Sequence, residues 1–317
     1  MIFRTLLFLL LAPHVVLGAD YPTRPVRLVV PFPPGGGADT LARVIGQAMS
    51  ERFKQTLVID NRGGAGGLVG AEIVARAVPD GYTLLLGTQS THGTNPSLYK
   101  TLPYDAIAGF APIALLASAP NVLVVHPSVA AINVKELIAL ARRKPGELNY
   151  ASVGVGSSQQ LVAELFKSRA GIDVTHVPYK GTGPALTDLM SGQVQMMFTN
   201  LITSASHIKS GKLRGLAVTT QKRTRTAPEM PTVAEVIPGF EAASWYGLLA
   251  PAGTSTAIVT TLNQSVGAIL ATPQMQERLT SGGADPAGGS PQDFSAYIRT
   301  EIKKYAEIAK LAGVRPE

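Results

Sequence analysis

The feature that most constrains the fold is a strand-like run followed by a glycine-rich turn and a helical pattern. Val26 to Val30 is typical of a strand, Pro31-Phe32-Pro33-Pro34-Gly35-Gly36-Gly37-Ala38-Asp39-Thr40 forms the turn, and apolar residues recur at helical spacing up to Phe53. Glycine lets the backbone approach a ligand, Asp39 or Thr40 is expected to cap the helix, and first-turn N–H groups carry partial positive charge. The turn predicts a site for a carboxylate or phosphate, the alternative being a plain connection in an α/β domain.

The same arrangement occurs a second time. A strand expected at 148–152 leads into Val153-Gly154-Val155-Gly156-Ser157-Ser158, and a helix follows. Strands and helices alternate elsewhere, which is typical of an α/β fold. Further strands are expected at 56–60, 82–87, 175–177, 194–198, 213–219 and 245–250, and helices at 68–78, 134–143, 184–190, 201–209, 256–270, 274–280 and 291–311. We expect two α/β lobes joined by long extended crossings such as 114–126, with a ligand in the cleft where two helix N-termini face each other.

The first residues predict export. Residues 1–19 combine Arg4, the apolar run 6–11 and the small residues Gly18 and Ala19, which is the pattern of a secretory signal peptide cleaved after Ala19. No later segment has the roughly 18 to 20 uninterrupted apolar residues of a membrane helix. The chain has no cysteine, so disulfides, thiol nucleophiles and lipid attachment at cysteine are excluded.

Motifs for catalysis and metal binding are incomplete. Gly156-Ser157-Ser158-Gln159-Gln160 lacks the closing glycine of a nucleophile elbow. The five histidines show no metal-ligand spacing. Gly154-x-Gly156-x-x-Gln159 lacks the third glycine of a dinucleotide-binding motif, and Gly211-Lys212 lacks the upstream glycine and the Ser or Thr of a phosphate-binding loop. We expect no metal, no cofactor and no enzymatic activity, with a periplasmic hydrolase as the weakest alternative. The formal charge of +7 is scattered, which favours attraction of small anions over nucleic-acid binding.

A polar segment follows the strand expected at 82–87. Gly87-Thr88-Gln89-Ser90-Thr91-His92-Gly93-Thr94-Asn95-Pro96 is rich in hydrogen-bond donors, so we expect a ligand-lining loop, the alternative being a polar connector. Trp245 begins a later strand, where packing in a core or hinge is favoured over stacking on a ligand.

Ordered motifs along nearly all of the mature chain carry a resemblance to a known family. They are Tyr21-Pro22, Pro31 to Asp39, Asp60-Asn61-Arg62-Gly63-Gly64-Ala65-Gly66-Gly67, Pro79-Asp80-Gly81-Tyr82-Thr83, Pro178-Tyr179-Lys180-Gly181, Asp188-Leu189, Gly192-Gln193-Val194, His207 to Arg214 and Trp245 to Thr254. With the signal peptide, they make the chain resemble the Bug receptors, the periplasmic substrate-binding proteins of tripartite tricarboxylate transporters.

The resemblance implies a type II periplasmic-binding-protein fold that closes over a small carboxylate, held through backbone amides without an arginine clamp. Lobe 1 would comprise residues 20–122 and 244–317, and lobe 2 residues 123–243. The implied ligand-binding residues are Phe32, Pro34, Gly36, Gly37 and Asp39 in the first grip, Thr88, Ser90, His92 and Asn95 along the same lobe, and Gly154, Gly156, Ser157 and Ser158 opposite.

Two positions depart from the family pattern. Gln160 replaces a histidine before Leu161, and Thr199 replaces an aspartate that follows the phenylalanine of the Met-Met-Phe strand. Such an acid pairs with the ammonium of amino-acid ligands, so Thr199 in the cleft favours a non-aminated acid. The implied protein is a periplasmic monomer that delivers its ligand to membrane transporter subunits. The alternative is a receptor that presents its ligand to the sensor kinase of a two-component system.

Overall fold

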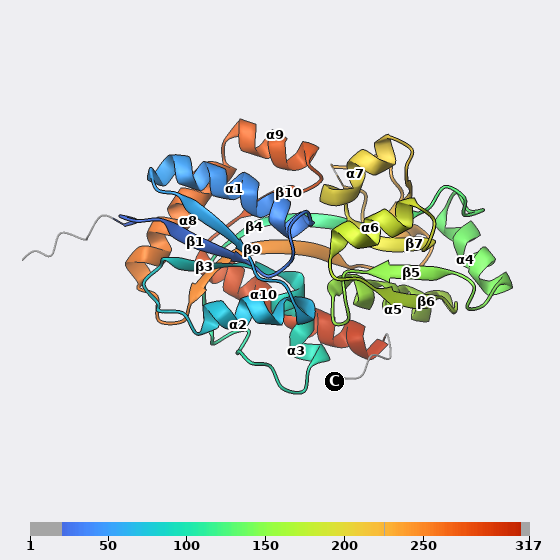
Figure 1. The fold of residues 1–317 in the computed structure, drawn as a ribbon, viewed down its shortest axis with the longest axis horizontal. Coiled ribbons are helices and arrows are strands. Elements are labelled where there is room, and N and C mark those ends of the chain that lie inside the picture. The colour runs from blue at the N-terminus through green and yellow to red at the C-terminus, as the bar shows by residue number, and fades with distance from the viewer. Residues whose placement is uncertain (1–20, 225, 312–317) are drawn as a thin grey trace, which may run out of the picture.

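Two α/β lobes lie side by side along the long axis of the molecule (Figure 1). The structure is a computed structural model that describes residues 21–224 and 226–311. The predicted signal peptide, residues 1–19, lies outside the described residues. None of the described helices is long and apolar enough to cross a membrane.

Strands and helices alternate through most of the chain. The strands are β1 (Val26–Val30), β2 (Leu57–Asn61), β3 (Thr83–Thr88), β4 (Phe110–Val125), β5 (Asn149–Ser152), β6 (Thr175–Pro178), β7 (Met196–Asn200), β8 (Arg214–Val218), β9 (Ala243–Pro251) and β10 (Asp285–Gly288). The α-helices are α1 (Gly37–Phe53), α2 (Leu68–Ala75), α3 (Asn95–Leu98), α4 (Val134–Arg143), α5 (Ser158–Ala170), α6 (Thr182–Met190), α7 (Leu201–Lys209), α8 (Thr256–Leu270), α9 (Pro273–Ser281) and α10 (Pro291–Leu311). Short helical turns η1 (Ala65–Gly67), η2 (Ser90–Thr94) and η3 (Val233–Glu235) complete the set.

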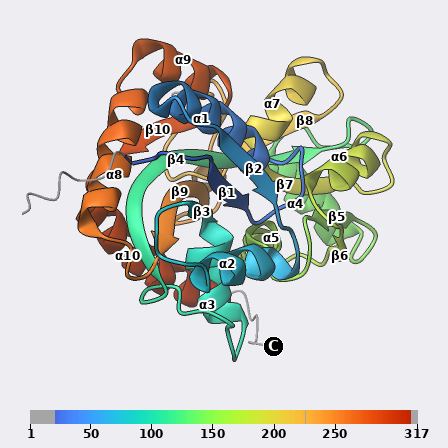
Figure 2. The same ribbon diagram turned by 60° about the vertical axis from the view of Figure 1, so that its left-hand side comes forward.

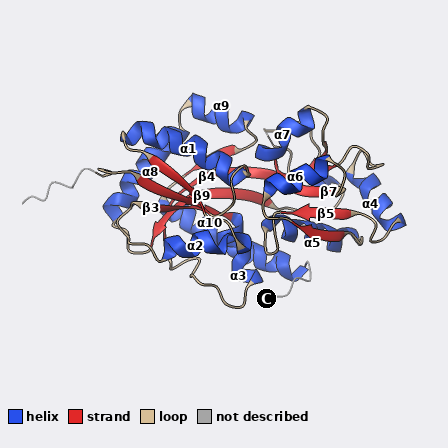
Figure 3. Cartoon of the chain, viewed as in Figure 1, coloured by secondary structure: helices blue, strands red, loops and turns tan. Residues whose placement is uncertain are grey.

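In the first lobe, the sheet runs β2-β1-β3-β9-β4, and β10 pairs with β4. Side chains of β1 alternate between its two faces, as strand geometry requires. Leu28 and Val30 pack with α1 and α8, whereas Val29 packs with α2 and the start of α10. Figure 3 shows helices on both sides of these strands. Both faces of the sheet are therefore buried, and β1 is a nearly continuous apolar run.

In the second lobe, β4, β7, β5 and β6 are neighbours, and β8 pairs with β4. The end of β4 alternates in the same way. Leu123 and Val125 face the core beneath α4 and α5, whereas Val122 and Val124 face α6 and α7. Each lobe thus has a core on both faces of its part of the sheet.

The lobes are connected through β4 and β9. Residues 110–120 of β4 pair with β9, ending at Pro120 opposite Ala243, whereas residues 121–125 pair with β7 and β8. Figure 2 shows β4 curving through both lobes. The predicted long extended crossing is confirmed.

Helix α10 spans both lobes. Its first half places Phe294 and Ile298 in the core of the first lobe, and its second half places Tyr305 and Ile308 in the core of the second. The Tyr305 hydroxyl also donates to the carbonyl of Ala243, over 3.0 Å. The sequence division assigned the whole helix to lobe 1, but its C-terminal half contacts lobe 2.

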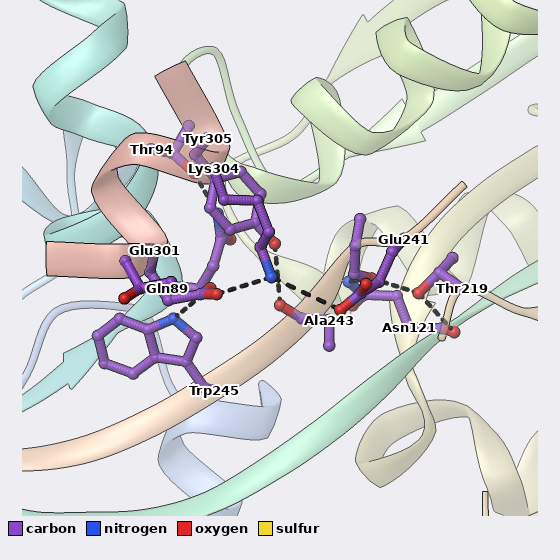
Figure 4. Close-up of polar contacts among 12 residues, drawn as sticks. Gln89, Thr94, Asn121, Thr219, Glu241, Ala243, Trp245, Glu301, Lys304 and Tyr305 are labelled. Carbon is purple, nitrogen blue, oxygen red and sulfur yellow. Dashed lines mark hydrogen bonds and ion pairs between the residues drawn. The ribbon is translucent and has the colours of Figure 1, made fainter. Parts of the chain in front are cut away.

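Polar contacts join α10 to the crossing strand β9 (Figure 4). Trp245 Nε1 donates to Glu301 Oε2 over 3.0 Å, and Lys304 Nζ lies 2.6 Å from Glu301 Oε1. Lys304 Nζ is also 3.8 Å from Glu241, two residues before the start of β9. Burial raises the pKa of Glu301, and the hydrogen bonds from Lys304 and Trp245 offset only part of that rise.

Two local predictions were incomplete. The segment expected to be a loop at 87–96 contains η2 and the start of α3, and internal hydrogen bonds stabilise it there: the Thr91 hydroxyl accepts the Thr88 N–H over 2.9 Å. β10 was not predicted, because Asp285-Pro286-Ala287-Gly288 has no β-branched or aromatic residue.

Candidate ligand-binding site

A cavity of about 40 Å³ lies between the lobes. Its walls come from both lobes and from the crossing strand β9. The lining residues are Phe32, Gly36, Gly37, Ala38, Thr88, Gln89, Ser90, Val153, Ser158, Gln159, Thr182, Asn200, Ser244, Trp245 and Tyr246. None of these described residues has a charged side chain. We call this space the inner cavity.

The N-termini of four helices converge on the inner cavity. Helix α1 contributes Gly36 to Ala38, α5 contributes Ser158 and Gln159, α6 contributes Thr182, and α7 contributes its N-cap, Asn200. Each helix N-terminus carries a partial positive charge. The sequence predicted two such termini facing each other, and the structure brings four together. This arrangement favours an anion without a charged side chain.

Backbone donors of α1 face no partner within the described chain. The N–H groups of Gly37 and Ala38 form no hydrogen bond with any described residue. Both residues line the inner cavity. They are therefore suited to donate to an anion bound there.

The first glycine turn is fixed by Asp39. Its Oδ2 accepts from the Gly35 N–H and from Arg43 Nε, each over 3.0 Å. Burial acts to raise the pKa of Asp39, but the hydrogen bonds from Arg43 and Gly35 outweigh it and hold the pKa below its usual range. The prediction that Asp39 or Thr40 caps α1 was wrong: the N-cap is Gly36, with no side-chain cap, and Asp39 reaches back to the turn instead.

A second, larger space adjoins the inner cavity and shares Phe32 and Val153 with it. It has a volume of about 680 Å³ and is open to solvent; we call it the outer cavity. Its other lining residues are Pro33, Pro34, Asn61, Gly63 to Gly67, Gly154, Val155, Tyr179, Lys180 and Gly181. Pro34 and Gly154, which were predicted to bind ligand, lie on the outer cavity.

Only some residues of the polar segment after β3 line the inner cavity. Thr88 and Ser90 line the inner cavity, and Ser90 Oγ accepts the Ser158 N–H of the other lobe over 3.2 Å. His92 and Asn95 line neither cavity. Both are fully buried behind the wall.

His92 and Asn95 have structural partners in the first lobe. His92 Nδ1 is 2.8 Å from the Thr91 hydroxyl, and its ring packs against Phe110. Burial lowers the pKa of His92 to about 3, so the ring is neutral. Asn95 Nδ2 donates to the carbonyl of Gly66 over 3.2 Å. Both side chains therefore support the wall from behind.

The residues predicted in the second lobe also differ in whether they line the inner cavity. Ser158 lines the inner cavity, whereas Ser157 is the buried N-cap of α5 and accepts the Gln160 N–H. Gly156 lines neither cavity, and its N–H donates to Gln160 Oε1 over 2.8 Å. Thr199 is buried, with its hydroxyl 3.1 Å from that of Thr203. Its neighbour Asn200 lines the cavity instead.

Several cavity residues were not predicted. They are Ala38, Gln89, Val153, Gln159, Thr182, Asn200, Ser244, Trp245 and Tyr246. A signal for Asn200 is present in the sequence, because an asparagine before the helix expected at 201–209 is a typical N-cap. Gln89 Oε1 is buried without a hydrogen-bond partner among the described residues.

Two α/β lobes joined by crossing strands, with helix N-termini around a cleft, define a solute-binding protein of the periplasmic type. Residues 41–314 match the family described as "Tripartite tricarboxylate transporter family receptor", and the chain belongs to this family. Protein BugT of Bordetella pertussis is 36% identical over 297 residues, which are 93% of this chain and 91% of BugT.

Two solved structures from Rhodopseudomonas palustris are similar over nearly the whole chain. Rpa4515 with adipate has a TM-score of 0.92 and 44% identity, covering 94% of this chain and 100% of that one. MatC with bound malate has a TM-score of 0.86 and 34% identity, covering 91% of this chain and 99% of that one. The predicted Bug resemblance and fold are thereby confirmed.

Proposed function

We propose that this receptor binds a small carboxylate between its lobes in the periplasm and delivers it to the membrane subunits of a tripartite tricarboxylate transporter. It acts as a monomer and has no enzymatic activity. The observation that carries the proposal is the convergence of four helix N-termini on a cavity whose described lining residues are all uncharged. Partial charges and N–H groups there match one carboxylate.

The proposed contacts come from both lobes. A carboxylate oxygen accepts from the free N–H groups of Gly37 and Ala38, and the second oxygen faces Ser158 and Tyr246. Burial raises the pKa of Tyr246, so its hydroxyl stays protonated and can donate. Hydrogen bonds to a charged group contribute about 1.5–3 kcal/mol each. Because the donors lie on separate lobes, the ligand favours the closed form.

We propose the lobe boundaries predicted from the sequence, with residues 20–122 and 244–317 in lobe 1 and 123–243 in lobe 2, except that the C-terminal half of α10 packs in the core of lobe 2. The exchange of partners along β4 after Pro120 supports the first boundary. No acidic side chain is among the described residues that line either cavity, which supports a ligand without an ammonium group. Adipate and malate, named with the two similar structures, are such acids.

The test is a thermal-shift screen of the mature protein followed by titration calorimetry. Non-aminated mono- and dicarboxylates should raise the unfolding temperature, and sugar phosphates should not, because no lysine or arginine is among the described residues that line the inner cavity. A ligand at 100 times its Kd should add about 2.7 kcal/mol to the free energy of unfolding. If sugars or metal ions shift the transition and no carboxylate does, the proposal is wrong.

A further inference from the structure

We propose that Lys180 binds a second anionic group of the ligand, and that the outer cavity holds an apolar chain between the two anionic ends. This receptor would then select dicarboxylates with an unsubstituted spacer over monocarboxylates and hydroxy acids. The inference rests on the proposed function, because it takes the first carboxylate to be bound in the inner cavity.

The volumes of the two cavities require a ligand that extends outward. The inner cavity, about 40 Å³, has room for little more than one carboxylate head. The outer cavity, about 680 Å³, continues from it past Phe32 and Val153. A carboxylate bound at the helix N-termini therefore directs the rest of its chain into the outer cavity.

The wall of the outer cavity is mainly apolar. Phe32, Pro33 and Pro34 form one side, and Val155 faces them from the other lobe. The Tyr179 hydroxyl is already engaged, because it donates to Asp188 over 2.7 Å. Val155 is 46% exposed, and an apolar ligand chain in the outer cavity would cover it. Methylene groups suit this wall better than hydroxyl groups, which would lose hydrogen bonds to water.

Lys180 is the one charged side chain among the described residues that line either cavity. It forms no ion pair with any described residue. Its neighbour Gly181 is the N-cap of α6 and lies against Pro33 across the cleft. Thr182, two residues away, lines the inner cavity, and two residues span at most about 7 Å. Lys180 therefore lies on the wall of the outer cavity close to the inner cavity, on the side that a ligand extending several carbons beyond the first carboxylate would reach.

The experiment compares adipate with hexanoate, which share one chain length and differ in the second carboxylate. Calorimetry of the wild type should show tighter binding of adipate. Lys180→Met should weaken adipate roughly five- to tenfold and leave hexanoate unchanged. Lys180→Glu should reverse the preference and favour ε-aminocaproate, whose distal group is an ammonium. Lys212→Met, which removes an exposed lysine that lines neither cavity, is the matched control.

The possible results are distinct. Equal affinity of the wild type for adipate and hexanoate, or equal effects of Lys180→Met and Lys212→Met on adipate, would overturn the role of Lys180 and leave the proposed function standing. Failure of both acids, and of every other carboxylate, to bind the wild type would overturn the proposed function and this inference together. Thermal unfolding of each variant verifies that the fold is intact, as expected for exposed lysines.

Discussion

Asn200 and Tyr246 are hydrogen-bonded across the ligand cleft: Asn200 Nδ2 donates to the Tyr246 hydroxyl over 3.0 Å. Asn200 caps α7 in the second lobe, and Tyr246 lies on the crossing strand β9. Both side chains lie close to Gly37, in the first turn of α1. The three residues fix the distance between two helix N-termini at the inner cavity.

Replacement of Gly37 by alanine should abolish this arrangement. A Cβ at Gly37 would lie 2.5 Å from Asn200 Nδ2 and 2.7 Å from the Tyr246 hydroxyl, so both side chains must move. We expect at least a tenfold loss of carboxylate affinity by calorimetry, with the fold retained because alanine suits a helix. Gly267→Ala in α8 is the control, since no atom of the described residues beyond its own helix turn lies within 4 Å of an added Cβ there. Unchanged affinity in a folded Gly37→Ala protein would remove this turn from the site.

The sequence predicted the bounds of the helices and strands better than it predicted which of them are neighbours in space. Helices 134–143, 201–209, 256–270 and 291–311 agree with the structure in both bounds, because apolar spacing and cap residues are local signals. The convergence of four helices on one cavity depends on the order of strands in the sheet, which no local pattern encodes.

The burial of His92 illustrates the same limit within the site. His92 lies in a polar segment, and such segments are typical of loops that line a ligand. Its position behind the wall depends on tertiary contacts with Phe110 and Tyr104, which the local sequence does not encode. The first glycine turn shows the same limit: Gly36 has a φ of −88° and Gly35 a positive φ of 83°, a difference that the run of three glycines does not encode.

Closure of the cleft depends on Gly66. Its added Cβ would lie 2.9 Å from the carbonyl oxygen of Gly156 in the other lobe. We expect Gly66→Ala to prevent full closure, so that ligand no longer reduces the radius of gyration in small-angle scattering. Its φ of +62° also costs alanine about 1–2 kcal/mol of stability.

Gly211→Ala is the control that distinguishes backbone strain from the contact between the lobes. Gly211 has a φ of +73° and nothing within 4 Å of its Cβ, so alanine there carries the strain without the contact. It should lose similar stability and keep both affinity and compaction. Loss of compaction in both variants would show that strain, and not the contact with Gly156, is responsible.

Glu301 should make stability depend on pH. Because burial raises its pKa in the folded state above the unfolded value near 4.5, its contribution to stability is complete below that value and is lost as pH rises through the folded pKa. Glu301→Gln keeps an acceptor for Trp245 and removes the titration. The free energy of unfolding of the variant, relative to wild type, should therefore increase with pH above about 4.5 in denaturant titrations. A difference that is constant with pH would contradict the raised pKa.

Ser157 and Ser158 are adjacent but should have different roles. Ser157 Oγ accepts the Gln160 N–H as the N-cap of α5, so Ser157→Ala should cost about 1 kcal/mol of stability, measured by denaturant unfolding, with a small effect on affinity. Ser158 lines the inner cavity and is not the cap of α5; its hydroxyl donates to the adjacent Gln159 Oε1 over 3.1 Å. Ser158→Ala should therefore weaken carboxylate binding severalfold by calorimetry and leave stability within about 0.5 kcal/mol. The two variants are controls for each other. If Ser157→Ala weakens binding as much as Ser158→Ala does, the ligand depends on the orientation of α5 as a whole and not on the Ser158 hydroxyl.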